Sequence, residues 1–254
     1  MLRLLLAAAM LALASCAHAP ATSDEAGHWA NAGQLVLVTT ADWDAPTGTL
    51  RHYQRDGSGW RQVGDAFDVT VGRTGTAWGI GLHDARSDGP VKREGDGKAP
   101  AGVFAIGTAF GYASSAETGL DYKGMGANDW CIDVPESPMY NRIVDRTLAK
   151  APGLDKSTEP MRRDLHENGD QRYREGFVIE HNADGAIPNG GSCIFAHLWK
   201  APGVATAGCT AMAPGNMAPL LAWLDARQHP VFVELPLAQY AALKAGWRLP
   251  EIDR

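Results

Sequence analysis

The chain has 254 residues, with 23 Lys and Arg against 29 Asp and Glu, so its formal net charge is −6 at pH 7. Hydrophobic residues make up 45% of it, which is typical of a folded globular protein. No block of basic residues occurs, which argues against nucleic-acid binding. The sequence has no glycine-rich phosphate loop, so no nucleotide ligand is implied.

Residues 1–15 have the pattern of an export signal. One charge, Arg3, precedes an apolar run that is shorter than the roughly 20 residues needed to span a membrane. The run ends in Leu13-Ala14-Ser15-Cys16. Small residues before a cysteine resemble the lipobox of bacterial lipoproteins, in which the cysteine becomes the lipidated N-terminus. An ordinary secretory signal cut near residues 17–19 is the alternative.

The chain therefore divides into four expected segments. These are a lipoprotein signal peptide (1–15), a lipidated tether (16–31), one folded domain (32–236), and a C-terminal helix and tail (237–254). The lipobox implies a lipid anchor in the cell envelope with the protein facing the periplasm. Ala17 rather than Asp follows the cysteine, so we expect the outer rather than the inner membrane.

Short apolar runs bounded by Gly, Pro and polar residues predict strands along the domain. In chain order they are 34–40, 66–71, 102–107, 176–181, 192–198 and 230–235. Helical spacing is confined to the C-terminal part, over 216–227 and 237–245, with Asn216 as the cap of the first helix. The domain is therefore expected to be mainly β with peripheral helices, as a β-sandwich or barrel.

Residues 137–171 form a long, charged stretch punctuated by Pro and Gly, without a clear periodic pattern. Loops of this length in compact domains are often lids or walls of a binding site.

The cysteines indicate an exported protein with one free thiol. If Cys16 carries lipid, then Cys131, Cys193 and Cys209 remain in an oxidising compartment, and an odd number leaves at least one unpaired. A disulfide between Cys131 and Cys193 is one hypothesis, and it requires a Cα separation below about 7 Å. Cys209 is then the free thiol.

Cys209 and His197, twelve residues apart, have the types expected of a nucleophile and its base. A neighbouring imidazole or backbone N–H dipoles would lower the pKa of the thiol. Gly208 allows close approach of backbone to substrate, and the N–H groups of Gly208 and Cys209 would face an oxyanion. The alternative is that Cys209 is simply a small buried hydrophobic residue.

His197 followed by Thr206-Ala207-Gly208-Cys209 resembles the catalytic core of the L,D-transpeptidase (YkuD-type) family, whose signature is a His, a loop, and Ser/Thr-x-Gly-Cys. The segment 92–104 is similar to the family's Thr-Pro-x-Gly-x-Phe strand. The resemblance covers about residues 35–236 and implies a β-sandwich catalytic domain. Ala207 departs from the family's usual His, and Thr210 and Ala211 from its usual Arg, so the chain looks like a divergent branch.

The resemblance implies that peptidoglycan stem tetrapeptides are the substrate. Cys209 would attack the bond between diaminopimelate and D-alanine, and His197, oriented by a backbone carbonyl, would move the proton. An amine of a second stem would then take the acyl group, giving a 3→3 cross-link, with no metal or cofactor. Candidate substrate contacts are Thr206, Arg73, Tyr140 and Asn141; Arg73 has the chemistry to bind a carboxylate, and Asn141 is equally a turn former.

Two other functions are compatible with the same residues. Water in place of the amine would make the protein an L,D-carboxypeptidase or another hydrolase. Without an active thiol, it would be a non-catalytic envelope lipoprotein that binds the cell wall. In each case the partners are peptidoglycan and, through the N-terminal lipid, the membrane.

Overall fold

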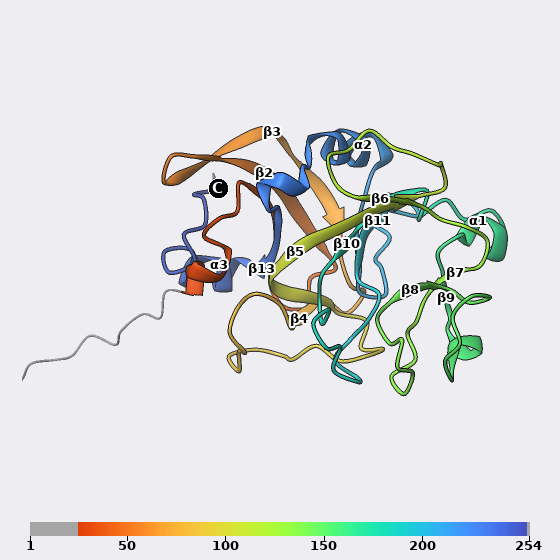
Figure 1. The fold of residues 1–254 in the computed structure, drawn as a ribbon. Helices are drawn as coiled ribbons and strands as arrows, with labels where there is room; N and C mark the ends of the chain where they lie inside the picture. Colours follow the sequence, from red (N-terminus) through yellow and green to blue (C-terminus); the bar gives the residue numbers. More distant parts are fainter. Residues whose placement is uncertain (1–24, 253–254) are drawn as a thin grey trace, which may run out of the picture.

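The structure is a computed structural model that describes residues 25–252 (Figure 1). The predicted signal peptide, the predicted lipidation site Cys16 and most of the predicted tether lie outside these residues. Within residues 25–252, no helix has both the length and the apolar character needed to cross a membrane.

Strands dominate the described part of the chain. They are β1 (Gln34–Thr40), β2 (Thr47–Asp56), β3 (Gly59–Thr70), β4 (Thr76–Trp78), β5 (Ala99–Gly111), β6 (Tyr122–Gly124), β7 (Asp129–Cys131), β8 (Ile143–Asp145), β9 (Glu159–Pro160), β10 (Glu175–Ile179), β11 (Phe195–Leu198), β12 (Thr210–Met212) and β13 (Val231–Pro236). The helices are α1 (Arg163–His166), α2 (Pro214–Trp223) and α3 (Leu237–Leu243), with 3-10 turns η1 (Glu25–Trp29), η2 (Leu154–Lys156) and η3 (Ala226–Gln228).

Eight of these strands close into one barrel-like sheet, in the order β10-β11-β12-β3-β2-β1-β13-β5 and back to β10 (Figure 1). Closure depends on the long strand β5, whose residues 102–105 pair with β13 and whose residues 106–111 pair with β10. The expectation of a mainly β domain is confirmed. Of the two architectures expected, sandwich or barrel, the sheet is barrel-like and not clearly a sandwich, because β5 pairs with both β13 and β10.

The barrel is filled by apolar side chains from nearly every strand, including Val36, Val38, Leu50, Phe104 and Phe177. Helix α2 closes one end of this core with Met217, Leu220 and Leu221. All seven residues of β1 are buried because η1 and α3 cover its outer face, which explains why this strand was readable as a continuous apolar run.

The ends of the described chain belong to the same domain. Trp29 and Trp247 are each at most 3% exposed, and their rings meet edge to face at 5.5 Å between centroids. Residues 25–31 were assigned to the tether and residues 237–254 to a separate tail. That division is wrong for the described residues, because both segments bury tryptophan against the outside of β1 and β13.

A second, small sheet in the order β8-β7-β9 lies beside the barrel, at the right of Figure 1. It is built largely from the long stretch 137–171, together with α1. A disulfide joins Cys131 of β7 to Cys193, just before β11, with a Cα separation of 5.9 Å. The predicted pairing is confirmed, and it fastens the small sheet to the barrel.

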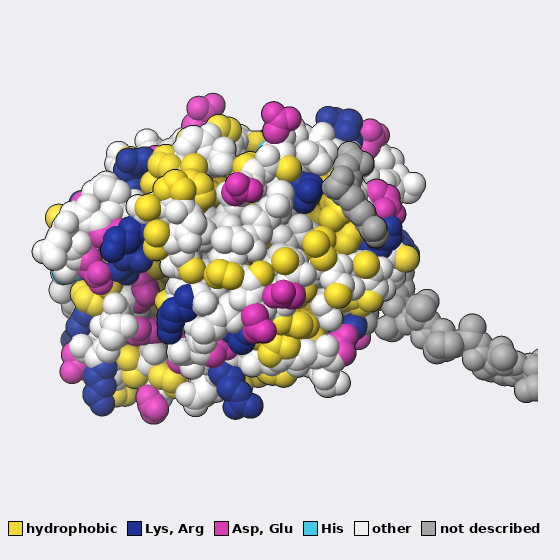
Figure 2. All heavy atoms as spheres, turned by 180° about the vertical axis from the view of Figure 1, so that it is seen from behind, with side chains coloured by type: hydrophobic (Ala, Val, Ile, Leu, Met, Phe, Trp, Pro, Cys, Tyr) yellow, Lys and Arg dark blue, Asp and Glu magenta, His cyan; other side chains and the backbone are white. Residues whose placement is uncertain are grey.

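Surface charges of both signs are interspersed with apolar atoms on the face shown in Figure 2. No single-sign patch forms on that face, in agreement with the absence of a basic block in the sequence.

A buried carboxyl, that of Glu234 on β13, contacts Thr210 on β12. Glu234 is 0% exposed, and its Oε2 accepts a hydrogen bond of 2.9 Å from the Thr210 hydroxyl, while Oε1 has no partner among residues 25–252. Burial raises the pKa of Glu234 to about 8. The carboxyl is therefore protonated at pH 7 and acts as a neutral core group.

We expect Glu234→Gln to stabilise the protein at pH 8. The unfolded chain releases the Glu234 proton above about pH 4.5 while the folded chain keeps it to about pH 8, so wild-type stability falls as pH rises between these values. At about 1.4 kcal/mol per pKa unit, the gain from Gln grows to a few kcal/mol. Urea unfolding at pH 5, 6.5 and 8 measures it; a difference between the proteins that does not grow with pH would contradict a neutral Glu234.

Candidate active site

His197 lies on β11, and Cys209 immediately precedes β12, the parallel strand beside it. His197 pairs in register with Ala211, two residues beyond Cys209. The Phe195 N–H donates to Cys209 Sγ at 3.4 Å, which places the thiol beside Phe195, two residues along β11 from His197. Both side chains line one cavity of about 370 Å³, so the fold brings the predicted pair together.

The imidazole of His197 is held by its own strand. Nδ1 lies 2.8 Å from the Leu198 carbonyl oxygen, which only accepts, so Nδ1 carries the proton and Nε2 keeps the lone pair. This is the backbone carbonyl expected beside the base. Burial lowers the pKa of His197 to about 4, and the guanidinium groups of Arg172 and Arg163 contribute to the decrease. The ring is therefore neutral at pH 7.

Cys209 differs from the activated thiol predicted from its neighbours. It is 8% exposed, and its Sγ also hydrogen-bonds the Cys193 carbonyl oxygen at 3.4 Å. Burial, and secondarily the carboxylate of Glu159, raise the pKa of Cys209 to about 12. The prediction of a lowered pKa is wrong for this state, because the thiol is buried near the Glu159 carboxylate and no hydrogen bond joins it to His197 within the described chain.

Alkylation of Cys209 by iodoacetamide is expected to be slow at neutral pH. Only the thiolate reacts, and with a pKa of about 12 its fraction at pH 8 is on the order of 10³-fold below that of a free cysteine. The rate should rise about tenfold per pH unit from pH 7 to 10. Carbamidomethylation followed by intact mass measures this, and protein in guanidinium with its disulfide intact is the control. A rate that levels off below pH 8 would indicate a thiolate instead.

Thr206 shapes the turn that carries Cys209. Its hydroxyl donates to the Cys209 carbonyl oxygen at 2.6 Å and accepts from the Gly208 N–H at 3.0 Å. The Gly208 N–H, which we expected to face an oxyanion, is therefore already engaged. A Cβ on Gly208 would lie 3.0 Å from the Lys98 carbonyl oxygen, so glycine is needed for this close packing. Thr206 thus appears in the structure as a turn residue with no spare hydroxyl proton.

A charged network forms the opposite wall of the cavity. The Tyr173 hydroxyl donates to Glu159 Oε1 at 2.6 Å, and Tyr173 packs edge-on against the His197 ring at 5.0 Å. Arg163 pairs with the same Glu159 oxygen at 3.0 Å, and with Glu167 and Asp170 at 2.8 and 3.2 Å. An interaction with the Tyr173 hydroxyl favours the thiolate of Cys209, but burial outweighs it.

The remaining predicted contacts are divided between the cavity and its support. Arg73 lines the cavity, and its backbone N–H donates to the Thr206 carbonyl oxygen at 2.9 Å. Tyr140 and Asn141 are not among the lining residues. Asn141 has a φ of 62° and holds backbone: its amide donates to the His181 and Asn182 carbonyl oxygens and its Oδ1 accepts from the Cys193 N–H at 2.8 Å.

Tyr140 belongs to a second hydrogen-bond network, which adjoins the cavity through Glu94 and Ser192. Its hydroxyl and that of Ser192 both donate to Glu94 Oε2, the latter at 2.7 Å. Glu94 and Lys92 line the cavity, and Lys92 is only 6% exposed, with a 2.6 Å ion pair to Asp96. The segment 92–96 is thus part of the cavity wall.

Sequence reasoning missed Glu159, Arg163 and Tyr173. The signal available was the stretch 137–171, expected to form a lid or wall, which supplies Glu159 and Arg163. Nothing in the local pattern distinguishes these two from other charged residues in the stretch. Their role comes from the small sheet, which turns β9 and α1 toward Cys209.

Within residues 25–252, no group of three or more His, Cys, Asp or Glu side chains is arranged to hold a metal ion. Comparison of the chain with protein-family models, with curated proteins and with solved structures gave no match.

Proposed function

We propose that this protein is a peptidoglycan L,D-transpeptidase that uses Cys209 as nucleophile and His197 as base. The observation that supports the proposal is that His197 on β11 and Cys209, just before the parallel strand β12, line a single cavity with the Thr206–Gly208 turn. We further propose that the barrel-like sheet is a divergent version of that family's catalytic domain, and that a lipid on Cys16 anchors it in the outer membrane.

The neutral state of both groups defines how the first step runs. Moving a proton from a thiol with a pKa of about 12 to an imidazole with a pKa of about 4 is strongly uphill in the resting site. The proton therefore leaves sulfur only as the S–C bond forms. His197 Nε2 accepts it and passes it to the nitrogen of D-alanine as that C–N bond breaks, which leaves a thioester on Cys209.

The second step reverses the first with a different amine. The side-chain amine of a second stem attacks the thioester, the new amide bond forms, and sulfur regains its proton through His197. Gly208 N–H is committed to Thr206. The donors that stabilise the oxyanion are then either freed when substrate displaces that hydrogen bond or supplied by other groups of the turn.

The mixed charge of the cavity supports a substrate that carries both signs. Its lining includes the cations Arg73, Lys92, Arg163 and Arg172 and the anions Glu94, Asp133, Glu159 and Glu167. The end of a diaminopimelate side chain has one amine and one carboxylate, so both kinds of partner are available. Arg73, exposed beside Thr206, is suited to the carboxylate and would replace the cation lost where Thr210 and Ala211 depart from the family pattern.

The test is intact mass spectrometry of the full chain after exposure to a carbapenem and, separately, to a stem tetrapeptide with an added D-amino acid. We expect a covalent adduct on Cys209 and a product in which the D-amino acid has replaced D-alanine. Tripeptide alone, with no exchange product, would show that the protein is an L,D-carboxypeptidase. No adduct and no turnover would contradict both enzyme activities and leave a wall-binding lipoprotein.

A further inference from the structure

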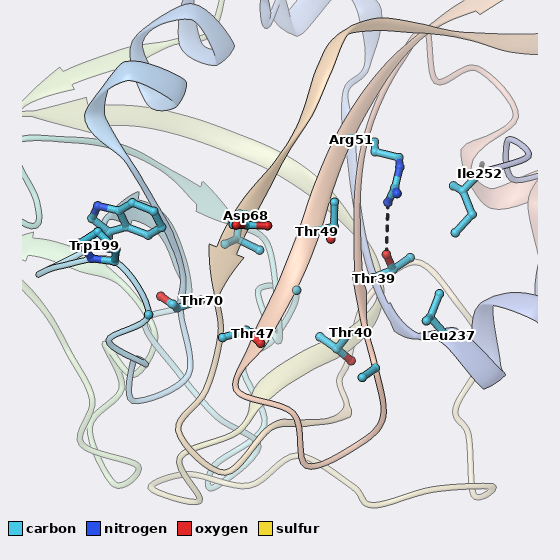
Figure 3. A pocket seen from close by; sticks show the side chains of 15 residues that line it. Thr39, Thr40, Thr47, Thr49, Arg51, Asp68, Thr70, Trp199, Leu237 and Ile252 are labelled. Atoms are coloured by element: carbon cyan, nitrogen blue, oxygen red, sulfur yellow. Dashed lines mark hydrogen bonds between the residues drawn. The ribbon is translucent and has the colours of Figure 1, made fainter. Parts of the chain in front are cut away.

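A second cavity, of about 780 Å³, lies on the outside of the barrel across β1, β2 and β3 (Figure 3). We call it the threonine trough. Its floor contains hydroxyls from three adjacent strands: Thr39, Thr49, Thr47 and Thr70, with Asp68 between them. Thr39 pairs with Thr49 and Thr49 with Asp68, so these side chains form a row that runs across the strands.

Both ends of the trough are apolar; one is aromatic and the other aliphatic. Trp199 stands at one end, and Leu237 and Ile252 stand at the other (Figure 3). Trp199 is half-buried, and its backbone N–H is fixed by the Met212 carbonyl oxygen at 2.9 Å. Three strands at about 4.8 Å spacing make the floor on the order of 10 Å wide. The trough therefore has an aromatic end and a long polar floor.

Most polar groups of the floor are not used by the fold. Within the described residues, the exposed side chain of Asp68 has no hydrogen bond or ion pair, and Arg51 makes one long contact of 3.4 Å to the Thr39 hydroxyl. The Thr70 hydroxyl is fully buried without a partner, although a buried hydroxyl is normally hydrogen-bonded. The exposed carboxylate of Asp68 and the hydroxyls of Thr47 and Thr49 are the groups that a ligand can reach.

This combination indicates a ligand with many hydroxyls and an apolar face. A sugar ring has both: C–H groups on its face pack against an aromatic ring, and hydroxyls at its edge bond to carboxylates and alcohols. An anionic ligand is disfavoured by the free carboxylate of Asp68 in the middle of the floor. A peptide strand would need an open sheet edge, and the floor is the face of paired strands.

The trough shares a wall with the cavity of Cys209. Residues 199–205 connect His197 on β11 to the turn of the nucleophile. Trp199, Pro202 and Gly203 line the trough, while Thr206 and Ala207 line the cysteine cavity. A ligand in the trough therefore contacts the loop that leads to the nucleophile.

We infer that the threonine trough binds the glycan strand of peptidoglycan while the attached stem peptide enters the cavity of Cys209. This inference rests on the proposed function for the identity of the glycan. Trp199 stacks on a sugar ring, and Asp68 with the threonine row accepts and donates hydrogen bonds to its hydroxyls. The enzyme thus recognises both parts of the polymer, one on each side of the 199–205 loop.

The test is isothermal titration calorimetry of the full chain carrying Cys209→Ser, with a peptide-free tetrasaccharide of alternating N-acetylglucosamine and N-acetylmuramic acid whose lactyl carboxyls are capped as amides, so that the ligand is neutral as it is in the stem-bearing strand. We expect binding that weakens by about tenfold or more in Asp68→Asn and in Trp199→Ala. The matched control is Asp65→Asn, because Asp65 is exposed on the same strand β3 but outside the trough, and its affinity should not change.

A separate assay distinguishes failure of this inference from failure of the proposed function. Turnover of free tetrapeptide should be unchanged in Asp68→Asn, whereas KM for glycan-linked stems should rise. Absent binding of the tetrasaccharide, or equal binding by Asp68→Asn and Asp65→Asn, would overturn the trough as a glycan site even if free tetrapeptide is turned over. Tetrasaccharide binding without any turnover would support the trough and contradict the transpeptidase.

Discussion

Substitution of Cys209 by serine is expected to lower release of D-alanine from a stem tetrapeptide by a factor on the order of 10⁴ to 10⁶. His197, with a pKa of about 4, is a weak base. It can assist loss of a proton from a thiol during attack but is far too weak to activate an alcohol, whose pKa is several units higher. Rates from mass-resolved product formation under single-turnover conditions measure the loss.

Serine keeps the other features of the site, so this variant separates chemistry from folding. Its hydroxyl still reaches the Cys193 carbonyl oxygen, and its unfolding midpoint should match that of the wild type. His197→Gln is the companion variant, expected to lose about 10² to 10⁴ in rate because the proton acceptor is gone while the hydrogen-bonding shape remains. Full activity of Cys209→Ser would disprove thiol catalysis.

The double variant Cys131→Ala, Cys193→Ala is expected to be less stable by about 4 kcal/mol. The disulfide closes a loop with a sequence separation of 62, and removing it restores that much chain entropy to the unfolded state. Activity should fall as well, since Cys193 supplies the carbonyl next to Sγ and Asn141 fixes the Cys193 N–H. Urea unfolding monitored by circular dichroism, with turnover in parallel, measures both effects.

Reduction of the wild-type protein should reproduce the instability of the double variant. Repeating both measurements in the Cys209→Ser background removes incorrect pairing with the third cysteine as a cause. If the double variant unfolds at the same urea concentration as the wild type, the small sheet is held on the barrel by packing alone, and the disulfide contributes little.

The fold was predictable where burial leaves a pattern in the sequence and not where it does not. Strand β1 was predicted at its observed bounds because both of its faces are buried. Strand β2 was missed because its residues are mostly polar and half-exposed, and it is held by backbone pairing to β1 and β3. Helix α2 begins at Pro214, two residues before the expected cap, since proline suits the first turn.

Barrel closure was also beyond the sequence, because it depends on one strand having two partners. Nothing in the apolar run at 102–107 shows that β5 continues to Gly111 and pairs with both β13 and β10. The tether boundary was misplaced for a similar reason. Only the contact between Trp29 and Trp247, 218 positions apart in the sequence, shows that both ends pack on the domain.

The candidate site was predictable in its residue types but not in its electrostatics. The motif predicts Cys209 and His197. Counting the cysteines predicts at least one unpaired thiol, and the 131–193 disulfide was a hypothesis that the structure confirms. The ionisation of the thiol does not, since the sequence gives neither its burial nor the nearby Glu159 carboxylate. Tyr140 and Asn141 were placed in the right region, yet only the structure shows that they support backbone rather than line the cavity.

The protonated state of Cys209 has a consequence for oxidative folding. A free thiol beside a disulfide normally invites exchange, in which a thiolate attacks one sulfur and scrambles the pairing. Cys209 sits within hydrogen-bonding distance of the Cys193 backbone, but burial keeps its proton in place. Once the chain has folded, the Cys209 thiol is therefore expected not to attack the disulfide beside it, and mispairing is confined to the time before Cys209 becomes buried.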